Sequence, residues 1–180
     1  DDIREAMDQA GVPFNKLNKV ILTHQDIDHI GGLPEILKVS DHDVEVLAHE
    51  KDKPYIEGEK PLIKMGAVTG TPPQADVDTT VEDGEELPFG GGLTVIFTPG
   101  HTPGHISLYH KQSKTLITGD ALIAENGKPI GLNERATPDM ETAVQSLKKF
   151  VPYDIETVIC YHGGVCTGNV NEQIAQLADH

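Results

Sequence analysis

The sequence has 180 residues, of which 37% are hydrophobic and 24% charged, so it is long enough for one domain with an apolar core and short for two. Its net charge of −15 is expected to repel a polyanion, which excludes nucleic acid as the expected partner. No apolar run approaches the roughly 18 residues that a membrane span needs. We therefore expect a cytoplasmic protein without membrane contact that acts on a small molecule.

The first part of the chain predicts a helix, a buried strand, a second helix and a second strand. The first helix covers residues 2–10, with acidic residues at its start and Gly11 placed to end it. The strand covers 18–23 and is followed at once by a polar cluster. A helix is then expected over 33–39, and the alternating stretch 44–49 predicts the next strand.

The second part of the chain opens with residues 51–75, which are rich in Pro, Gly and Lys and predict an irregular insertion over the surface. Helices are predicted over 138–150, where apolar residues recur at helical spacing, and over 169–178. Strands are predicted over 79–82, 93–98, 106–110, 114–118 and 156–161. This alternation predicts a single α/β layered domain over residues 1–180.

Ligand-type side chains follow the carboxyl ends of four predicted strands. They are His24, His101, Asp120 and His162. Because strand ends at one edge of a sheet converge, residues far apart in sequence can share one site there. One histidine at a strand end is more often structural, but four such ends, each with a ligand-type residue and interpreted as flanked by glycine or proline, predict a metal site.

The first of these strand ends carries the cluster H-Q-D-I-D-H. On a loop or extended segment, His24, Asp26 and Asp28 point in one direction and His29 points elsewhere, so the cluster can supply ligands to two adjacent ions. The alternative for this cluster by itself is a hydrated acidic turn.

Four ordered motifs resemble the signature of the metallo-β-lactamase superfamily, which includes glyoxalase II-type thioesterases and lactonases. They are the cluster at 24–29, the G-H-T turn at 100–102, the T-G-D segment at 118–120 and the final His162. The resemblance covers nearly the whole chain from the strand at 18–23 onwards. It implies a four-layer αββα sandwich with a dinuclear site at one edge of its two sheets.

The ligand set implied by the resemblance has two parts. One divalent ion would be held by His24, Asp26 and His101, and a second by Asp28, His29 and His162, with Asp120 bridging both. The implied enzyme is a metal-dependent hydrolase in which a hydroxide between the ions attacks the carbonyl of a small thioester, lactone or related ester or amide. Asp28 and Asp120 are its expected catalytic residues, with Asp28 orienting the nucleophile.

One departure from the family pattern is Asp26, which stands where most members have His. A carboxylate is a harder ligand than imidazole, so it shifts preference from zinc toward iron or manganese. Zinc stays the first expectation. A diiron redox protein of the flavodiiron type is an alternative, because that branch also has an acidic residue here and the same spacing between the residues matching His101 and Asp120. The sequence has no flavin domain to support it.

A second departure is at the start of the chain. Family members open with strands before their first helix, whereas only 23 residues precede His24 here, and the first of them predict a helix. We therefore expect an N-terminally truncated member of the fold. A missing strand pair would expose a sheet edge, which predicts self-association. An inactive metal-binding fragment is the remaining alternative.

The other candidate residues receive supporting roles. His105 is expected to support the site behind His101. The remaining histidines, His42, His49, His110 and His180, are expected to be surface or structural residues. Cys160 is expected in the core, and so is Cys166, for which the mouth of the site is the alternative.

Two locations are possible for three lysines of the predicted insertion. Lys53, Lys60 and Lys64 are expected on a solvated face, and a substrate groove is the alternative.

Overall fold

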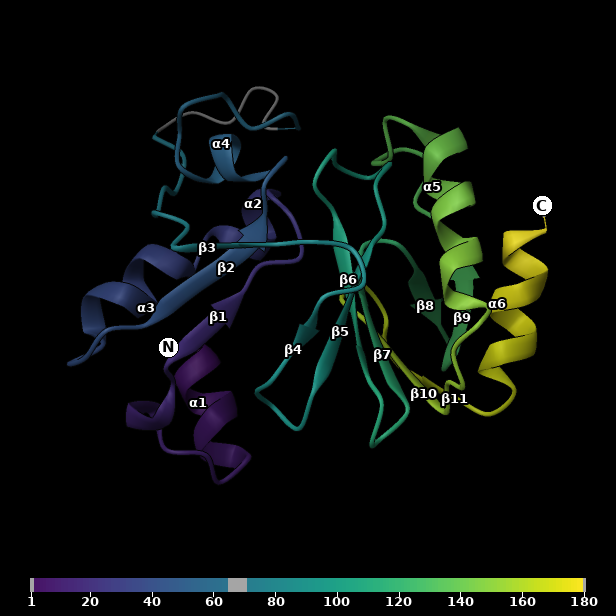
Figure 1. The fold of residues 1–180 in the computed structure, drawn as a ribbon, viewed down its shortest axis with the longest axis horizontal. Helices are drawn as coiled ribbons and strands as arrows, with labels where there is room; N and C mark the ends of the chain where they lie inside the picture. Colours follow the sequence, from purple (N-terminus) through teal and green to yellow (C-terminus); the bar gives the residue numbers. More distant parts are fainter. Residues whose placement is uncertain (1, 65–70, 180) are drawn as a thin grey trace.

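The computed structural model describes residues 2–64 and 71–179 and arranges them in four layers, helix, sheet, sheet and helix (Figure 1). The smaller sheet has three parallel strands in the order β1 (Lys19–Ile21), β2 (Glu45–His49) and β3 (Thr79–Val81). Residues 65–70 of the predicted insertion and His180 lie outside the described part of the chain.

The larger sheet has six strands in the order β11-β10-β7-β6-β5-β4. Their bounds are β4 (Glu86–Leu87), β5 (Leu93–Phe97), β6 (Ile106–His110), β7 (Thr115–Gly119), β10 (Thr157–Cys160) and β11 (Gly164–Thr167). All its neighbouring strands are antiparallel except β7 and β10, which are parallel. A separate hairpin is formed by β8 (Ile123–Glu125) and β9 (Lys128–Gly131).

Helices cover the outer faces of both sheets (Figure 1). On the side of the small sheet they are α2 (Ile27–Ile30), α3 (Leu33–Val39) and α4 (Lys53–Ile56), and on the side of the large sheet α5 (Met140–Leu147) and α6 (Val170–Ala178). Helix α1 (Asp2–Gln9) precedes them in the chain and has no buried residue. Two short 3₁₀ helices cover Phe14–Lys16 and Lys148–Phe150. None of the described helices is long and apolar enough to cross a membrane.

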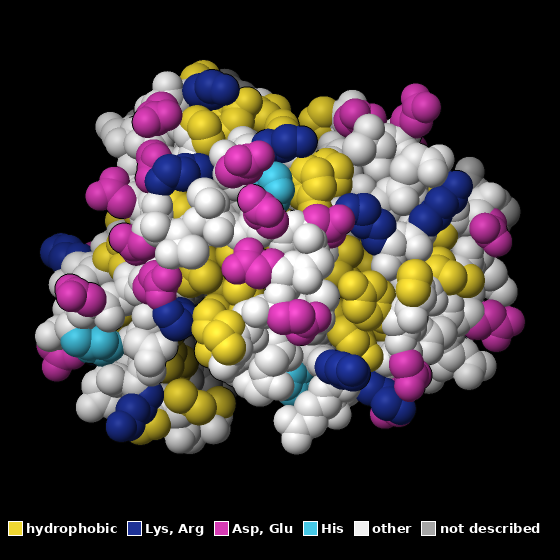
Figure 2. Space-filling model, in the orientation of Figure 1, with side chains coloured by type: hydrophobic (Ala, Val, Ile, Leu, Met, Phe, Trp, Pro, Cys, Tyr) yellow, Lys and Arg dark blue, Asp and Glu magenta, His cyan; other side chains and the backbone are white. Residues whose placement is uncertain are grey.

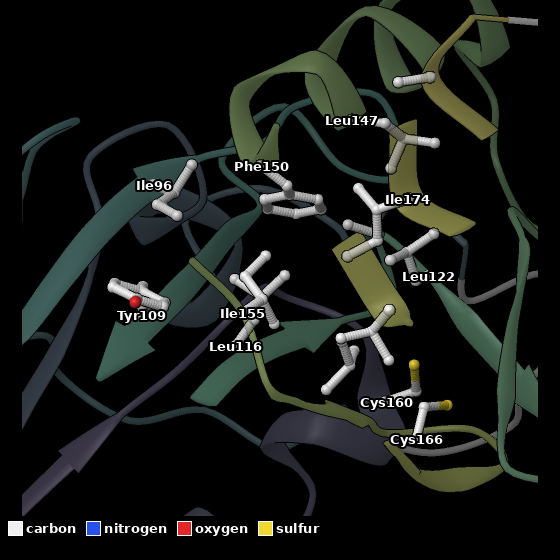
Figure 3. Packing of buried hydrophobic residues seen from close by; sticks show 14 residues of the cluster. Ile96, Tyr109, Leu116, Leu122, Leu147, Phe150, Ile155, Cys160, Cys166 and Ile174 are labelled. Carbon is white, nitrogen blue, oxygen red and sulfur yellow. The ribbon is translucent and has the colours of Figure 1, made fainter. Parts of the chain in front are cut away.

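Three apolar clusters fill the three spaces between the layers. In β2 the side chains alternate: Val46 and Ala48 pack with the helices of the small sheet, while Leu47 packs with strands of the large sheet. The third cluster joins the large sheet to α5 and α6, and Leu116, Phe150 and Ile174 point toward one another in it (Figure 3). The core is therefore divided by the sheets, and each sheet is covered on both faces.

The predicted αββα layering and the predicted strands of both sheets are confirmed. Several short elements were not predicted. The insertion at 51–75 contains α4, and β4, β8, β9 and β11 have only two to four residues each, which is too short for a clear hydrophobic period. The prediction of a loop or extended segment for the polar cluster is wrong for its second half, since helix α2 starts at Ile27.

The two cysteines lie together in the third cluster, beside Leu122 (Figure 3). Cys160 is 2% exposed and Cys166 is fully buried. Burial raises the pKa of the Cys160 thiol to about 12. Both therefore pack as small apolar side chains, and the alternative position of Cys166 at the mouth of the site is wrong.

The surface carries the negative charge seen in the composition. Asp and Glu side chains are spread across the face shown in Figure 2, and the Lys and Arg side chains on that face stand singly or in small groups. Of the described histidines outside the cluster, His42 pairs with Asp41, and His49 stacks on Phe97 with 4.2 Å between ring centroids.

Candidate metal centre

The seven predicted ligand residues come from five places in the chain, four of them directly beyond the end of a strand. His24 and Asp26 follow β1, and Asp28 and His29 belong to α2. The other three are His101 in the turn after β5, Asp120 immediately after β7, and His162 after β10. The structure brings all seven side chains together, as the pattern of strand ends predicted.

One group of donor atoms comprises His24, Asp26, His101 and Asp120, and they all lie within 4.8 Å of one another. His101 Nε2 is 2.9 Å from Asp26 Oδ2 and 3.2 Å from Asp120 Oδ2. His24 Nε2 is 3.4 Å from Asp26 Oδ2. Two imidazoles and two carboxylates at this spacing can surround one divalent ion.

A second group comprises Asp28, His29 and His162, with donor atoms again within 4.8 Å. His29 Nε2 is 3.7 Å from Asp28 Oδ2, and His162 Nε2 is 3.4 Å from it. Asp120 adjoins this group as well. Its Oδ1 is 3.2 Å from His29 Nε2 and its Oδ2 is 3.4 Å from His162 Nε2.

Three buried atoms of these groups have no hydrogen-bond partner among the described residues: His24 Nε2, His29 Nε2 and Asp120 Oδ1. A buried polar atom without a partner costs free energy, so such atoms mark places where a ligand completes the site. Thr23 Oγ1 lies 3.0 Å from His24 Nδ1 and 3.3 Å from His29 Nδ1. Because Thr23 lies against both Nδ1 atoms, the two Nε2 atoms are free to bind a metal ion. These donor atoms therefore fit a metal site.

The carboxylates of the site are held in their ionised form. Burial raises the pKa of Asp26, but its hydrogen bond with His101 and the adjacent His24 and Lys64 outweigh this effect and leave the pKa well below its ordinary value. Burial likewise opposes ionisation of Asp120, but the rings of His101 and His29, each 3.2 Å from one of its oxygens, outweigh this effect and leave its pKa well lowered. Both side chains are therefore ready to act as anionic ligands at neutral pH.

The two histidines of the first group differ. Burial lowers the pKa of His24, which is 1% exposed, and keeps its ring neutral. Burial also acts to lower the pKa of His101, but hydrogen bonds with Asp120 and Asp26 raise it above its ordinary value. A divalent ion would therefore compete with a proton at His101 more than at His24.

Helix α2 gives the cluster its shape. After Asp26 the chain turns into a single helical turn, which places Asp28 and His29 together on the side of His162. The ring of Tyr161 lies 3.8 Å from that of His29, centroid to centroid, and its hydroxyl donates to the Asp28 carbonyl at 2.9 Å. Sequence reasoning missed Tyr161, although its position beside His162 was a signal.

Lys64 is a second residue that sequence reasoning misplaced. Its Nζ is 2.5 Å from Asp26 Oδ2, 2.7 Å from His101 Nε2 and 3.0 Å from the Ala136 carbonyl oxygen. The expectation of a solvated face is therefore wrong for Lys64. The expectation is confirmed for Lys60, which is exposed and whose Nζ lies 5.4 Å from the centroid of the Tyr55 ring in α4.

His105 supports the site, but through Asp120 rather than His101. It is fully buried, its Nε2 accepts the backbone N–H of Asp120 at 3.0 Å, and its Nδ1 lies 2.8 Å from Thr98 Oγ1. Burial, with the neighbouring His24 and His101, lowers its pKa well below the ordinary value. A neutral His105 can thus accept at Nε2 and fix the start of the Asp120 segment.

Two of the hollows that border the cluster reach Asp26 or His101. One of about 90 Å³ is lined by Asp26, Ile27, Asp28, Leu62 and Lys64. Another of about 340 Å³ reaches His101 between Ile63 and Thr142. A small molecule could approach the donor atoms from either side.

Comparisons with known proteins agree with this geometry. Residues 1–162 match the family described as the metallo-beta-lactamase superfamily. The chain is 33% identical over 204 residues to the "Probable metallo-hydrolase YflN" of Bacillus subtilis, covering 98% of this chain and 76% of that one. It is 31% identical over 148 residues to a hydroxyacylglutathione hydrolase of Brucella anthropi, covering 81% of this chain and 47% of that one.

Among solved structures, the BLEG-1 B3 metallo-beta-lactamase superposes with a TM-score of 0.75 at 25% identity, covering 99% of this chain and 81% of that one. The chain belongs to the metallo-beta-lactamase superfamily.

Proposed function

We propose that this chain is a hydrolase that holds two divalent ions, one at His24, Asp26 and His101 and the other at Asp28, His29 and His162, with Asp120 between them. The observation that supports this most is the position of Asp120, whose two oxygens adjoin histidines of both groups. Zinc is the first expectation for the metal, and Asp26 leaves iron or manganese as the alternative.

Two such ions, when bound, supply an activated water and polarise the carbonyl that it attacks. The residues of the chain have separate tasks. Asp120 spans the two groups and fixes their separation. The side chain of Asp28 is 44% exposed, so its carboxylate can orient the attacking water and pass a proton to a leaving group.

The proposed substrate is a small thioester, lactone or related ester or amide. The hollows beside the cluster are small, and Leu62 and Ile63 give them apolar walls. One relative is named hydroxyacylglutathione hydrolase, which supports an acyl substrate for this chain. The net charge of −15 argues against a polyanionic substrate.

The test combines metal content and hydrolysis. Elemental analysis of the purified chain is expected to find about two ions per chain, and a panel of thioesters and lactones is expected to be hydrolysed. Removal of metal by a chelator should abolish the activity, and added metal should restore it. Asp120→Asn, which keeps the size of the side chain but not its charge, should lose both metal and activity. A metal-free chain, or hydrolysis that survives chelation, would contradict the proposal.

A further inference from the structure

Asp52 is a fully buried carboxylate that belongs to neither group of donor atoms. It lies immediately before α4. Burying a carboxylate is costly unless its oxygens are hydrogen-bonded or paired with a cation. No Lys or Arg in the described part of the chain forms an ion pair with it, so its hydrogen bonds must account for its presence.

Both oxygens of Asp52 accept two hydrogen bonds. Oδ1 accepts from Gln25 Nε2 at 3.0 Å and from the backbone N–H of Gly104 at 2.7 Å. Oδ2 accepts from the backbone N–H of Gln25 at 3.0 Å and from the Thr102 hydroxyl at 2.6 Å. Three of these partners are N–H groups that can only donate, so the surroundings fit an ionised carboxylate.

The four donors come from the two segments that carry the first group of ligands. Gln25 stands between His24 and Asp26, and Thr102 follows His101 directly. The backbones of these segments are thus tied to one side chain. Gln25 also accepts from the Ile63 backbone at 3.0 Å, which ties in the segment that carries Lys64.

Gly104 allows this close approach. A Cβ atom there would lie 2.4 Å from the backbone nitrogen of Asp52 and 2.7 Å from its side chain, closer than real atoms approach. The turn after β5 is therefore packed directly onto Asp52, with no side chain between them.

We propose that Asp52 is a positioning residue that fixes the His24–Asp26 segment relative to His101 and so determines how tightly the first group holds a divalent ion. The inference rests on the proposed metal binding, to which it adds a residue that touches neither ion. The second group has no such link, because none of the four donors adjoins Asp28, His29 or His162.

Asp52→Asn tests this with almost no change of shape. An amide has one acceptor oxygen and one donor nitrogen, so in either orientation its nitrogen faces a backbone N–H, that of Gln25 or that of Gly104. One of the two segments must then move away. Thr102→Val is a milder variant that removes only one of the four hydrogen bonds.

The zinc affinity of each group of donor atoms is measured separately, in a variant that has lost one ligand of the other group. Zinc affinity is measured by competition with a chromophoric chelator in a His162→Ala background, which keeps the first group, and in a His101→Ala background, which keeps the second. Asp52→Asn is expected to weaken zinc binding about 10- to 100-fold in the first background, the usual cost of losing a partner behind a metal ligand. In the second background it should change little. Thr102→Val should act in the same direction to a smaller extent.

Ile174→Val, a change in the core of α6 far from both segments, is the control for lost stability. A purely structural role for Asp52 would weaken both groups equally, as a general loss of stability does, and that result would overturn the inference. Unchanged zinc affinity in the His162→Ala background would overturn it too. Absence of zinc binding by the unmodified chain would instead contradict the proposed function, which keeps the two failures distinguishable.

Discussion

At the scale of single residues, Asp26 distinguishes this centre from the usual family pattern. It contributes a third carboxylate to the two groups, and it contacts both His101 and Lys64. A harder, more anionic ligand set is expected to favour iron or manganese relative to zinc. Lys64 partly offsets the added negative charge, since its ammonium lies against the same oxygen atom.

Asp26→His is expected to raise the zinc-to-iron ratio of the bound metal, because imidazole is the softer ligand. The ratio is measured by elemental analysis after expression with equal supplies of both metals. Asp76→His makes the same substitution at an exposed position that belongs to neither group of donor atoms, and it should leave the ratio unchanged. An unchanged ratio in Asp26→His would mean that ligand hardness at this position does not determine metal choice.

Lys64→Met is expected to tighten zinc binding by the first group. The Lys64 ammonium contacts Asp26 Oδ2 and His101 Nε2, the two atoms that a bound ion needs. An ion must displace this contact, and hydrogen bonds to charged groups contribute roughly 1.5–3 kcal/mol. Partial exposure of Lys64 reduces this, so we expect a gain of about tenfold, or about 1.4 kcal/mol. Lys60→Met removes the same charge from the same loop without touching the site. If both variants bind zinc equally well, the contact of Lys64 has no influence on affinity.

The seven candidate ligands could be named from sequence because each has a ligand-type side chain and lies in one of four polar segments that follow a strand. Their proximity is now a geometric fact, and their role as ligands stays a prediction. Lys64, Tyr161 and Asp52 could not be identified in this way. Their importance depends on how the irregular segment after β2 and the end of β10 fold back onto the strand ends, which no periodicity encodes.

At the scale of elements, α5 supports the turn that carries His101. The Asp139 N–H donates to the Gly100 carbonyl at 3.2 Å, and the Ser146 hydroxyl donates to the Pro99 carbonyl at 2.7 Å. Gly100 has a φ of +129°, and a Cβ atom there would lie 2.4 Å from the backbone nitrogen of Ala143. Helix and turn are therefore in direct backbone contact.

Gly100→Ala is expected to destabilise the fold by two effects. A φ of +129° costs a non-glycine residue about 1–3 kcal/mol, and overlap with α5 adds about 1–3 kcal/mol. Gly92→Ala is the control, because its φ is +95° but nothing lies within 4 Å of the added atom. The free energy of unfolding in urea should fall clearly further for Gly100→Ala. Equal losses in the two variants would show that α5 yields to the added methyl group.

The elements that sequence predicted well are those with a sustained pattern. Helix α5 has apolar residues at helical spacing and an N-terminal Asp139 whose side chain accepts from the Thr142 N–H, and strand β5 is a nearly continuous apolar run. Elements such as β4 and β11 form because a neighbouring strand offers hydrogen bonds to them. That is a tertiary effect, so local sequence carries little trace of it.

At the scale of the whole molecule, the feature to consider is the edge of the small sheet that β1 forms. In the small sheet β1 pairs only with β2 among the described residues. The Asn18 carbonyl and the Leu22 N–H point toward β2, where they bond with Glu45 and Leu47. Because direction alternates along a strand, the N–H and carbonyl groups of Lys19 and Ile21 point outward from the sheet.

We propose that this edge of β1 pairs with the same edge of a second copy of the chain, since outward-facing backbone groups bind another strand when one is available. Sedimentation velocity over a range of concentrations is expected to show reversible association. Lys19→Pro removes one outward N–H and should shift the equilibrium to the monomer. Lys19→Ala keeps that N–H and loses the ion pair with Glu45 and the contact with the Phe89 ring, so it should associate like the unmodified chain. If Lys19→Ala weakened association as much as Lys19→Pro, side-chain contacts rather than strand pairing would hold the copies together, and a monomer at all concentrations would exclude the interface.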